Sequence, residues 1–428
     1  MELTSYWQAT TPRFDGGHME EVGGHYDVAI IGAGFTGLSA ARHLAKAGCK
    51  VAVLEAREVG HGASCRNGGH LNNGMAHGYG DAMARFGAEG ARKLYHTYDA
   101  SIDLIEQLIE EENIDCNFRR SGKLKLASKP GHVDGMKAAC ALIRDEADSD
   151  VVFLDQADLA GEIRSTAAYA GMLYPKSAMM HMGRYMHGLA TAVTRHGGDV
   201  VENAPVTTMH RDGGSWQLNT PKGHLSARNI IVATGAYSGQ FTSQPFRYFS
   251  RRIIPVGSYI IVTRPLTEAE IAGSVPGNRT YVTSLNVGHY FRLSPDNRLI
   301  FGGRAQFSSK SDATSDAASA KILREGLAQM FPALAGIEVD YCFGGLVDMT
   351  QDRLPRAGHV DGMYYAMGYS GHGAQMSNQM GVVLADMILG KDNNPLADMT
   401  WPAIPMYTGR PWFLPAVGAY YRFKDMIS

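Results

Sequence analysis

The regular part of the chain opens with two short apolar runs, separated by a glycine-rich turn and a helical stretch. The first run covers residues 26–31 and leads into the turn at residues 32–37. The second run covers residues 50–54 and ends at the acid Glu55. Strand, glycine turn, helix, strand and acid in this order predict a Rossmann-like βαβ unit.

Later segments alternate between helical and strand periodicity. A stripe of apolar residues from Leu94 to Ile109 predicts a helix over residues 81–112. Further helices are predicted at residues 184–197, 313–331 and 374–389. Strands are predicted at residues 200–201, 206–209, 228–234, 259–262, 290–293, 299–301, 338–347 and 363–367. Residues 1–25 lack such a pattern, and we expect an extended lead-in.

The dinucleotide-type elements come from separated blocks of the chain, so we predict one domain with insertions rather than two consecutive domains. The expected fold is α/β. A Rossmann-like domain, with the βαβ unit and its GxGxxG turn, is interleaved with an α+β substrate domain on a mainly antiparallel sheet. The Rossmann-like domain is predicted to comprise residues 1–80, 170–245 and 340–428. The substrate domain is predicted to comprise residues 81–169 and 246–339.

The composition of the 428 residues is that of a globular protein, with 45% hydrophobic residues and a mean hydropathy of -0.17. A net charge of -2 gives no basic surface for nucleic acid. The first residues lack the basic head and apolar core of a signal peptide, and no run is apolar enough to span a bilayer. We therefore expect a cytoplasmic protein without a nucleic-acid partner.

Cysteine and histidine spacing favours neither a metal site nor a disulfide framework. The five cysteines form no CxxC pair and are odd in number. The sixteen histidines show no HxH or HExxH spacing. The sequence therefore predicts no metal ligand.

The glycine turn at residues 32–37 has the spacing of a dinucleotide-binding motif. Gly32 allows the tight turn, Gly34 lets the backbone approach a pyrophosphate, and Gly37 lets helix and strand pack closely. The N–H groups at the start of the helix face the phosphates, and Glu55 accepts hydrogen bonds from a ribose. The motif predicts an adenine dinucleotide and leaves NAD and FAD both open.

Two later glycine-rich loops offer groups that suit a flavin. Residues 60–70 bring together a hydroxyl, a guanidinium and an amide, at Ser64, Arg66 and Asn67. The loop at residues 367–373 follows an apolar strand and opens a long helix. The N-terminus of that helix would stabilise the negative edge of a reduced flavin. An ordinary polar loop and a tight strand-to-helix connection are the alternatives.

Together these segments resemble one known family. The turn at residues 32–37 and the loops at 62–69 and 368–373 resemble the D-amino-acid-oxidase-like FAD-dependent oxidoreductases, and within them the gamma-glutamylputrescine oxidase branch. Residues 290–299 and 344–348 extend the likeness over nearly the whole chain. The resemblance implies that the Rossmann-like domain is an FAD-binding domain and that the FAD is held non-covalently.

The resemblance also implies which residues would hold the cofactor. They come from all three loops and from the middle of the chain. The implied cofactor-binding residues are Gly32, Gly34, Phe35, Thr36, Gly37, Glu55, Ala56, Ser64, Arg66, Asn67, Gly68, Gly69, His70, Val206, Thr234, Gly235, Gly371, His372, Gly373 and Gln375.

Four positions depart from the pattern of such relatives. Val347 stands where amino-acid-oxidising relatives carry an arginine that binds the substrate carboxylate, and a carboxylate buried there without a cation would be costly. Gln375 replaces a lysine that helps to activate oxygen, so O2 and another electron acceptor both stay open. Cys342 is out of register with a flavin-linking cysteine, and Cys65 is interpreted as a small buried thiol.

The expected reaction is hydride transfer from the carbon beside a neutral amine to the flavin, followed by hydrolysis of the imine to an aldehyde. Tyr259, Tyr290 and Phe291 are candidates for an aromatic cavity wall that keeps the amine neutral, with sheet packing as the alternative. Asp348 either holds the amine or caps a turn. His372 is a candidate hydrogen-bond partner of the flavin or the substrate.

We therefore expect an FAD-dependent amine oxidoreductase that acts on a small molecule, a gamma-glutamylated polyamine such as gamma-glutamylputrescine. A second hypothesis is oxidation of a secondary or N-methyl amino acid, with Arg292 or Arg353 as a substitute cation. A third is a flavin-binding subunit without its own turnover. The sequence leaves the exact amine, the electron acceptor and the oligomeric state open.

Overall fold

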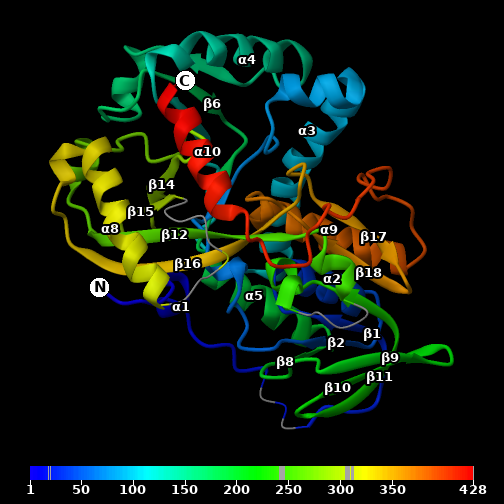
Figure 1. The fold of residues 1–428 in the computed structure, drawn as a ribbon. Coiled ribbons are helices and arrows are strands. Elements are labelled where there is room, and N and C mark those ends of the chain that lie inside the picture. The colour runs from blue at the N-terminus through cyan, green and yellow to red at the C-terminus, as the bar shows by residue number, and fades with distance from the viewer. Residues whose placement is uncertain (18, 20, 241–245, 304–308, 310–312, 428) are drawn as a thin grey trace.

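The computed structural model describes residues 1–428 apart from residues 18, 20, 241–245, 304–308, 310–312 and 428. Two eight-stranded sheets and one two-stranded sheet form its framework (Figure 1). Helices cover both large sheets. This arrangement confirms the predicted α/β class.

The first sheet contains the βαβ unit. Its main strands follow the order β17-β18-β11-β1-β2-β8 and are parallel except for β17 against β18. Central β1 has apolar clusters on both of its faces, which explains its continuous apolar run. Strand β10 pairs with β11, and β9 pairs with β10. The strands are β1 (His25–Ile31), β2 (Val51–Leu54), β8 (Asp199–Val201), β9 (Thr208–Asp212), β10 (Ser215–Thr220), β11 (Gly223–Val232), β17 (Arg356–Val360) and β18 (Met363–Met367).

One face of the first sheet is covered by packed helices. They are α2 (Phe35–Lys46), α5 (Met182–Arg195) and α9 (Gly373–Ile388), and α3 (Tyr79–Glu112) packs against α5 and α9. Helices α2 and α9 approach closely, because a Cβ on Gly381 would lie only 2.5 Å from the Thr36 carbonyl oxygen. The long α3 is kinked at Gly87, whose φ of 72° interrupts the helical backbone.

The second sheet has the order β16-β12-β15-β14-β13-β4-β6-β5 and is antiparallel apart from the pairing of β13 with β4. The predicted, mainly antiparallel second sheet is therefore confirmed. Its strands are β4 (Lys123–Ala127), β5 (Val152–Leu154), β6 (Ala170–Tyr174), β12 (Ile254–Pro265), β13 (Thr280–Thr283), β14 (His289–Leu293), β15 (Arg298–Gly303) and β16 (Val339–Met349).

The interleaved division into two domains stays a prediction, but strand pairing moves two of its boundaries. The predicted boundaries at residues 170 and 340 assign β6 and β16 to the Rossmann-like part. Both strands instead pair within the second sheet. The apolar pattern of a buried strand does not specify which neighbours it pairs with, so the sequence does not determine where these two boundaries lie.

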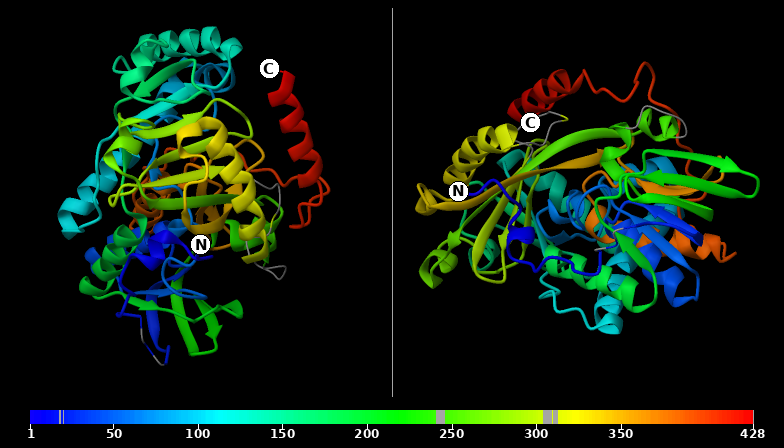
Figure 2. Two further views of the ribbon diagram at one scale, coloured as in Figure 1. Left: turned by 90° about the vertical axis from the view of Figure 1, so that its left-hand side faces the viewer. Right: turned by 90° about the horizontal axis from the view of Figure 1, so that it is seen from below.

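The outer face of the second sheet packs against α8 (Ala313–Met330). Figure 2 shows α10 on the outside of the molecule, where the Asn286 N–H donates to Asp425 Oδ1 at 2.9 Å. The remaining α-helices and strands are α1 (Tyr6–Ala9), α4 (Val133–Glu146), α6 (Arg247–Ser250), α7 (Glu268–Ala272), α10 (Leu414–Ile427), β3 (His70–Leu71) and β7 (Ala178–Met179).

The N-terminal segment differs from the predicted extended lead-in. It contains α1, in which Trp7 is fully buried and donates from Nε1 to the Asn67 carbonyl oxygen at 2.7 Å. An enclosed, hydrogen-bonded indole fixes this segment against the core.

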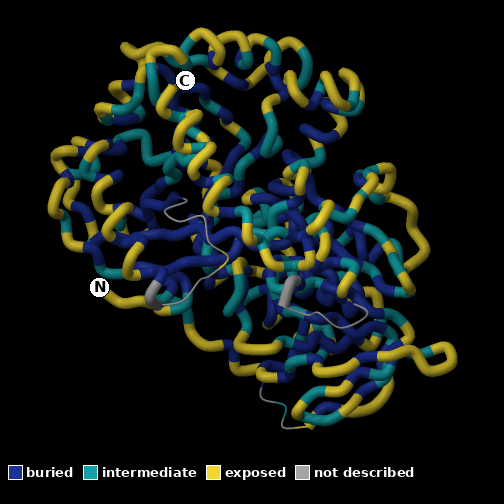
Figure 3. The backbone as a smooth tube through the Cα atoms, in the orientation of Figure 1, coloured by how far each residue is buried: buried dark blue, intermediate teal, exposed yellow. Residues whose placement is uncertain are grey.

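Figure 3 shows the buried backbone concentrated in the sheets and the exposed backbone in outer helices and loops. Within the described residues, none of the helices has the length and apolarity to cross a membrane.

Candidate active site

A cavity of about 850 Å³ opens between the two large sheets. It is lined by the turn after β1, the end of β2, the loop at residues 60–70, the loop after β18 and residues of β4, β13 and β14. The carboxyl ends of parallel strands meet at one edge of a sheet, and ligands of open α/β sheets bind there. The fold thus gathers the three glycine-rich loops around one space.

The three glycines of the first turn have different structural roles. Gly32 has a φ of 106°, and a Cβ on it would lie 2.8 Å from the Ala233 carbonyl oxygen. Gly34 lines the cavity. A Cβ on Gly37 would clash with the Gly32 carbonyl oxygen, and Gly37 is not among the described residues that line the cavity. Gly37 therefore serves helix packing, and its contact with a ligand stays a prediction.

The start of α2 presents backbone N–H groups to the cavity, as the motif predicts. Phe35 and Thr36 line it, and the Phe35 N–H donates to Ser64 Oγ at 3.1 Å. Thr36 Oγ1 lies 2.7 Å from the hydroxyl oxygen of Tyr369. The positive end of the helix dipole at this point suits a phosphate.

Glu55 ends β2 at the cavity and is held by backbone donors. Its Oε2 accepts from the Ala33 N–H at 2.8 Å, and its Oε1 accepts from the Arg57 N–H at 2.9 Å. Burial raises the pKa of Glu55, and these backbone donors oppose the shift. Ala56 and Val206 also line the cavity. A carboxylate fixed in this way keeps lone pairs for the hydroxyls of a ribose.

Asn67 organises the loop between Ser64 and Gly69. Its Nδ2 donates to the Ser64 carbonyl oxygen, and its Oδ1 accepts from the Gly69 N–H, each at 2.8 Å. Ser64, Asn67 and Gly68 line the cavity. Gly69 does not, because it packs against the Arg292 guanidinium, which a Cβ would approach to 2.8 Å. Gly69 shapes the loop, and its contact with a ligand stays a prediction.

Arg66 connects the same loop to the second sheet. Its Nε donates to the His61 carbonyl oxygen and its Nη1 to the Gly344 carbonyl oxygen, each at 3.0 Å. A Cβ on Gly345 would lie 2.5 Å from the Arg66 carbonyl oxygen, so glycine at this point lets the loop and β16 approach. Arg66 therefore lines the cavity with its guanidinium already bonded.

His70 stands in the cavity wall with its ring centroid 5.6 Å from that of Tyr290, edge to face. Burial and then the positive charges of Arg292 and Lys123 lower the pKa of His70 to about 3, so the ring is neutral at pH 7. Its Nε2 and Asn72 Oδ1 are buried without a hydrogen-bond partner among the described residues. Orphaned polar atoms in a cavity wall indicate a ligand that satisfies them.

The loop after β18 presents a second helix N-terminus, that of α9, to the cavity. Residues 371–373 line the cavity, and the ring of His372 lies 5.8 Å from that of Tyr98. Gln375 also lines it, and its Nε2 donates to the Asn72 carbonyl oxygen at 2.6 Å. The helix start, with its positive dipole end, suits an electron-rich ring edge.

Asp348 caps the turn before α9. Its Oδ2 accepts from the Gly368 N–H at 2.6 Å. Burial raises the pKa of Asp348 to about 6, and backbone donors at Gly368, Tyr369 and Ser370 oppose that shift. Of the two roles that the sequence left open, turn capping is the one observed in this geometry, although the side chain also lines the cavity.

The end of β11 reaches the cavity at the two residues that the sequence predicts to bind the cofactor. Thr234 and Gly235 line the cavity, and Thr234 Oγ1 lies 2.6 Å from Ser238 Oγ. Gly235 has a φ of 50°, which lets the chain turn away from the strand. Tyr237 lines the cavity too. Sequence reasoning missed this tyrosine because its only signal is its position two residues after Gly235.

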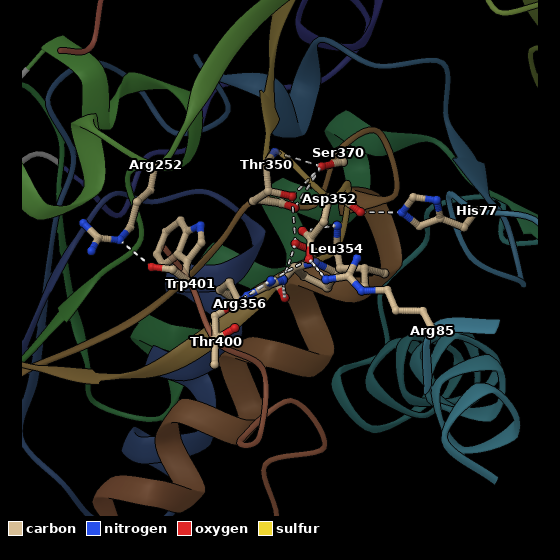
Figure 4. A network of polar contacts seen from close by, with 12 residues as sticks. His77, Arg85, Arg252, Thr350, Asp352, Leu354, Arg356, Ser370, Thr400 and Trp401 are labelled. Atoms are coloured by element: carbon tan, nitrogen blue, oxygen red, sulfur yellow. Dashed lines mark hydrogen bonds and ion pairs between the residues drawn. The ribbon is translucent and has the colours of Figure 1, made fainter. Parts of the chain in front are cut away.

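A polar network anchors the segment between β16 and β17 (Figure 4). Asp352 Oδ2 accepts from Arg85 and from Arg356, each at 2.7 Å. His77 Nε2 contacts the Asp352 carbonyl oxygen. The network fixes the backbone on either side of Arg353, whose exposed side chain lines the cavity.

Tyr259 and Phe291 are not among the described residues that line the cavity, and of the two alternatives sheet packing is the one observed for both. Both are fully buried in the apolar cluster between the second sheet and α8. Tyr290 instead lines the cavity, with its hydroxyl oxygen 2.9 Å from Ser258 Oγ. Successive residues of a strand point to opposite faces, so a shift of one position separates a core side chain from a cavity side chain.

Five Lys or Arg side chains and two carboxylates are among the described residues that line the cavity. Sequence reasoning missed Lys123 and Lys125, although the alternation of lysine and leucine at residues 123–126 indicates a strand with one polar face. Burial lowers the pKa of Lys123 to about 7 and also lowers that of Lys125. Arg292 is not in this lining, and its Nη2 donates to the Met180 carbonyl oxygen at 2.9 Å.

The two cysteines discussed above are buried free thiols. Burial raises the pKa of both Cys65 and Cys342 to about 12. Neither belongs to the described lining of the cavity, so neither thiol is placed to bond a ligand there. In the described part of the chain, no group of three or more His, Cys, Asp or Glu residues could hold a metal ion.

Two helix N-termini and a backbone-held acid around one cavity define a dinucleotide-binding oxidoreductase site. Comparison with known sequences narrows this class. The sequence matches the DAO family, FAD dependent oxidoreductases, over residues 27–387, and the chain belongs to this family. The protein is therefore an FAD-dependent oxidoreductase, which resolves the choice between NAD and FAD.

Individual relatives agree with this assignment. The chain is 35% identical over 377 residues to the probable oxidoreductase OrdL of Haemophilus influenzae, covering 86% of this chain and 84% of that protein. It is 30% identical over 406 residues to gamma-glutamylputrescine oxidoreductase of Escherichia coli, covering 94% of this chain and 93% of that protein. Glycine oxidase from Geobacillus kaustophilus shares the fold, with a TM-score of 0.72, 23% identity, and coverage of 90% of this chain and 98% of that one.

Proposed function

We propose that FAD lies across the three loops, with its pyrophosphate at the start of α2, a ribose at Glu55 and the flavin ring between His70 and residues 371–373. The orphaned His70 Nε2 and Asn72 Oδ1 support this placement, because both sit in the wall of the same cavity. When bound, FAD supplies the two-electron acceptor of the reaction.

We further propose that the substrate is an amine without a neighbouring carboxylate, of the gamma-glutamylated polyamine class. The observation that carries this proposal is Val347, which lines the cavity from β16 and pairs in register with another apolar residue, Val256. A carboxylate bound against this pair would be desolvated without a cation, which is costly. The 30% identity to gamma-glutamylputrescine oxidoreductase supports the same substrate class.

The chain's own residues would orient the amine and keep it uncharged. Tyr290, bonded to Ser258, and the neutral ring of His70 form a wall without negative charge. Desolvation there lowers the pKa of a substrate ammonium, and only the neutral amine has the lone pair that the oxidation needs. The adjacent C–H bond then breaks with its electron pair, the nitrogen loses a proton, and the imine takes up water to give an aldehyde and ammonia.

Product analysis under anaerobic conditions tests this proposal. FAD-loaded protein is mixed with gamma-glutamylputrescine, the aldehyde is trapped with a hydrazine, and ammonia is measured enzymatically. We expect equal amounts of aldehyde, ammonia and reduced FAD. A 2-oxo acid in place of the aldehyde would mean that the α-amino group of the glutamyl part is oxidised, and the proposal would fail. Peroxide production in air then separates O2 from another electron acceptor.

Oxidation of a secondary or N-methyl amino acid is the second candidate, and Arg353 is the observation that favours it. Its exposed guanidinium lines the cavity and is available to a carboxylate. If sarcosine or proline reduces the FAD, and if Arg353→Gln raises the concentration of sarcosine that is needed, this candidate replaces the first.

A further inference from the structure

Lys125 belongs to a row of side chains that crosses the inner face of the second sheet. It pairs in register with Met172 of β6 on one side and Val282 of β13 on the other. Val282 in turn pairs with Tyr290 of β14. Register partners point to the same face of a sheet, and all four residues line the cavity. The ammonium of Lys125 and the hydroxyl of Tyr290 therefore face the same space.

The Lys125 ammonium has no hydrogen-bond or ion-pair partner among the described residues, and burial alone lowers its pKa. The neighbouring Lys123 differs, because its Nζ donates to the Asn73 carbonyl oxygen at 2.6 Å and lies 3.9 Å from the centre of the Tyr174 ring. A partly desolvated ammonium without a partner is unfavourable unless a ligand supplies an anion. Lys125 is thus placed for an anionic group of a ligand.

The anionic groups of FAD have other partners in the proposed arrangement. The pyrophosphate is assigned to the start of α2, where Phe35 and Ser64 lie. The electron-rich edge of the flavin is assigned to residues 371–373 at the start of α9. Both assignments leave Lys125, on the second sheet, for the substrate.

The distance across the sheet indicates where the substrate's anion sits. Lys125 on β4 and Tyr290 on β14 are separated by β13, so their backbones lie two strand spacings apart, about 10 Å. The carboxylate of an α-amino acid is bonded to the carbon that carries the amine, so it stays beside Tyr290 when that carbon lies there. An acid several bonds further along an extended amine lies towards β4, the strand that carries Lys125.

We infer that Lys125 binds a carboxylate at the end of the substrate remote from the oxidised amine, with the charge of Lys123 adding to the attraction. This inference rests on the proposed function and deepens it. The same two ammonium groups repel an unmodified diamine, whose far end is positive. Lys125 would therefore select a diamine that has been acylated by a dicarboxylic or acidic amino acid over the free diamine.

Binding of a ligand that cannot be oxidised tests the inference without turnover. Gamma-glutamyl-n-butylamide keeps the acid head and lacks the reactive amine, and its Kd for FAD-loaded protein is measured by calorimetry. We expect Lys125→Met to raise the Kd about 10- to 100-fold, and Lys125→Arg to keep it within roughly fivefold of wild type. Lys137→Met, which changes an exposed lysine on α4, is the matched control and leaves the Kd unchanged.

Two further ligands isolate the carboxylate. Glutaryl-n-butylamide has the acid without the α-ammonium, and its Kd is expected to change in each variant as the Kd of the glutamyl ligand does. N-butylbutanamide has neither group and binds wild type and Lys125→Met equally weakly. FAD content and melting temperature establish that each variant is folded. If a folded Lys125→Met binds the glutamyl ligand like wild type, or if Arg353→Gln alone raises its Kd, the inference is overturned while the proposed function stands. If wild type itself does not bind the glutamyl ligand, both the inference and the proposed function are overturned.

Discussion

Asp348 Oδ2 accepts a hydrogen bond from the Gly368 N–H at 2.6 Å, and this bond ties the second sheet to the first sheet at the start of α9. Asp348 belongs to β16, and Gly368 directly follows β18. The bond orients the turn that presents residues 371–373 to the cavity. Asp348 therefore acts through the backbone as a positioning residue.

Removal of this acceptor is expected to weaken FAD binding. Asp348→Ala leaves the buried Gly368 N–H without its partner, and we expect the Kd for FAD to rise roughly 10- to 100-fold. Asp348→Asn keeps a carbonyl oxygen in the same place and is the matched control, with a Kd close to that of wild type. Quenching of flavin fluorescence during titration of the apoprotein measures both. Equal losses in the two variants would contradict the positioning role.

The raised pKa of Asp348 has a consequence for stability. Burial raises it to about 6 from an ordinary value of 3.8, so between these pH values the folded protein holds a proton that the unfolded chain has released. This site's contribution to stability is therefore fully present below pH 3.8, falls as the pH rises towards 6, and is constant above. We expect the melting temperature of wild type minus that of Asp348→Asn to fall by roughly 2–5 °C between about pH 4.5 and 6.5. If the difference between the two melting temperatures stays constant or rises over this pH range, the raised pKa of Asp348 is refuted.

Substitution by alanine is expected to have different effects at two glycines of the first turn: at one it lowers stability, and at the other it weakens FAD binding. Gly37→Ala introduces a methyl that clashes with the Gly32 carbonyl oxygen, and we expect the apoprotein to lose roughly 1–3 kcal/mol of stability. Gly34→Ala places a methyl 3.2 Å from Ser64 Oγ inside the cavity. It should leave the apoprotein stable and weaken FAD binding. Urea unfolding of each apoprotein measures its stability, and titration with FAD measures its affinity. Similar unfolding curves for Gly37→Ala and Gly34→Ala would contradict this prediction.

Tyr290 and Tyr259 should respond differently to loss of the hydroxyl. Tyr290 lines the cavity and bonds Ser258, so Tyr290→Phe is expected to slow anaerobic reduction of the FAD by substrate about 2- to 10-fold. Tyr259→Phe changes a core residue on the opposite face of the sheet and should leave that rate within roughly twofold of wild type. Stopped-flow absorbance at the flavin band measures both rates. A larger effect of Tyr259→Phe would restore its predicted place in the wall.

The order of elements around the glycine turn was predictable because it depends on local chemistry. Helix N-termini, positive φ at glycine and an acid at a strand end are properties of short segments, and the cavity contacts of Gly34, Glu55 and Ser64 follow from them. The long amphipathic helices were predictable for the same reason, since one apolar stripe specifies a buried face.

Features that depend on pairing between distant segments were not predictable from the sequence. Which face of a strand meets the cavity is decided by sheet register, and this placed Tyr290 in the wall and Tyr259 in the core. The place of Lys125 in the cavity wall depends on the pairing of β4 with β6 and β13. The buried Trp7 depends on an acceptor far along the chain, the carbonyl oxygen of Asn67.

Anaerobic titration of the FAD-loaded protein with a panel of amines tests the central claim most directly. The panel comprises gamma-glutamylputrescine, putrescine, sarcosine and proline, and loss of flavin absorbance is the readout. We predict complete bleaching by gamma-glutamylputrescine at concentrations that leave the flavin oxidised with the other three. Bleaching by sarcosine or proline, with none by gamma-glutamylputrescine, would contradict an amine substrate whose acid group lies far from the oxidised carbon.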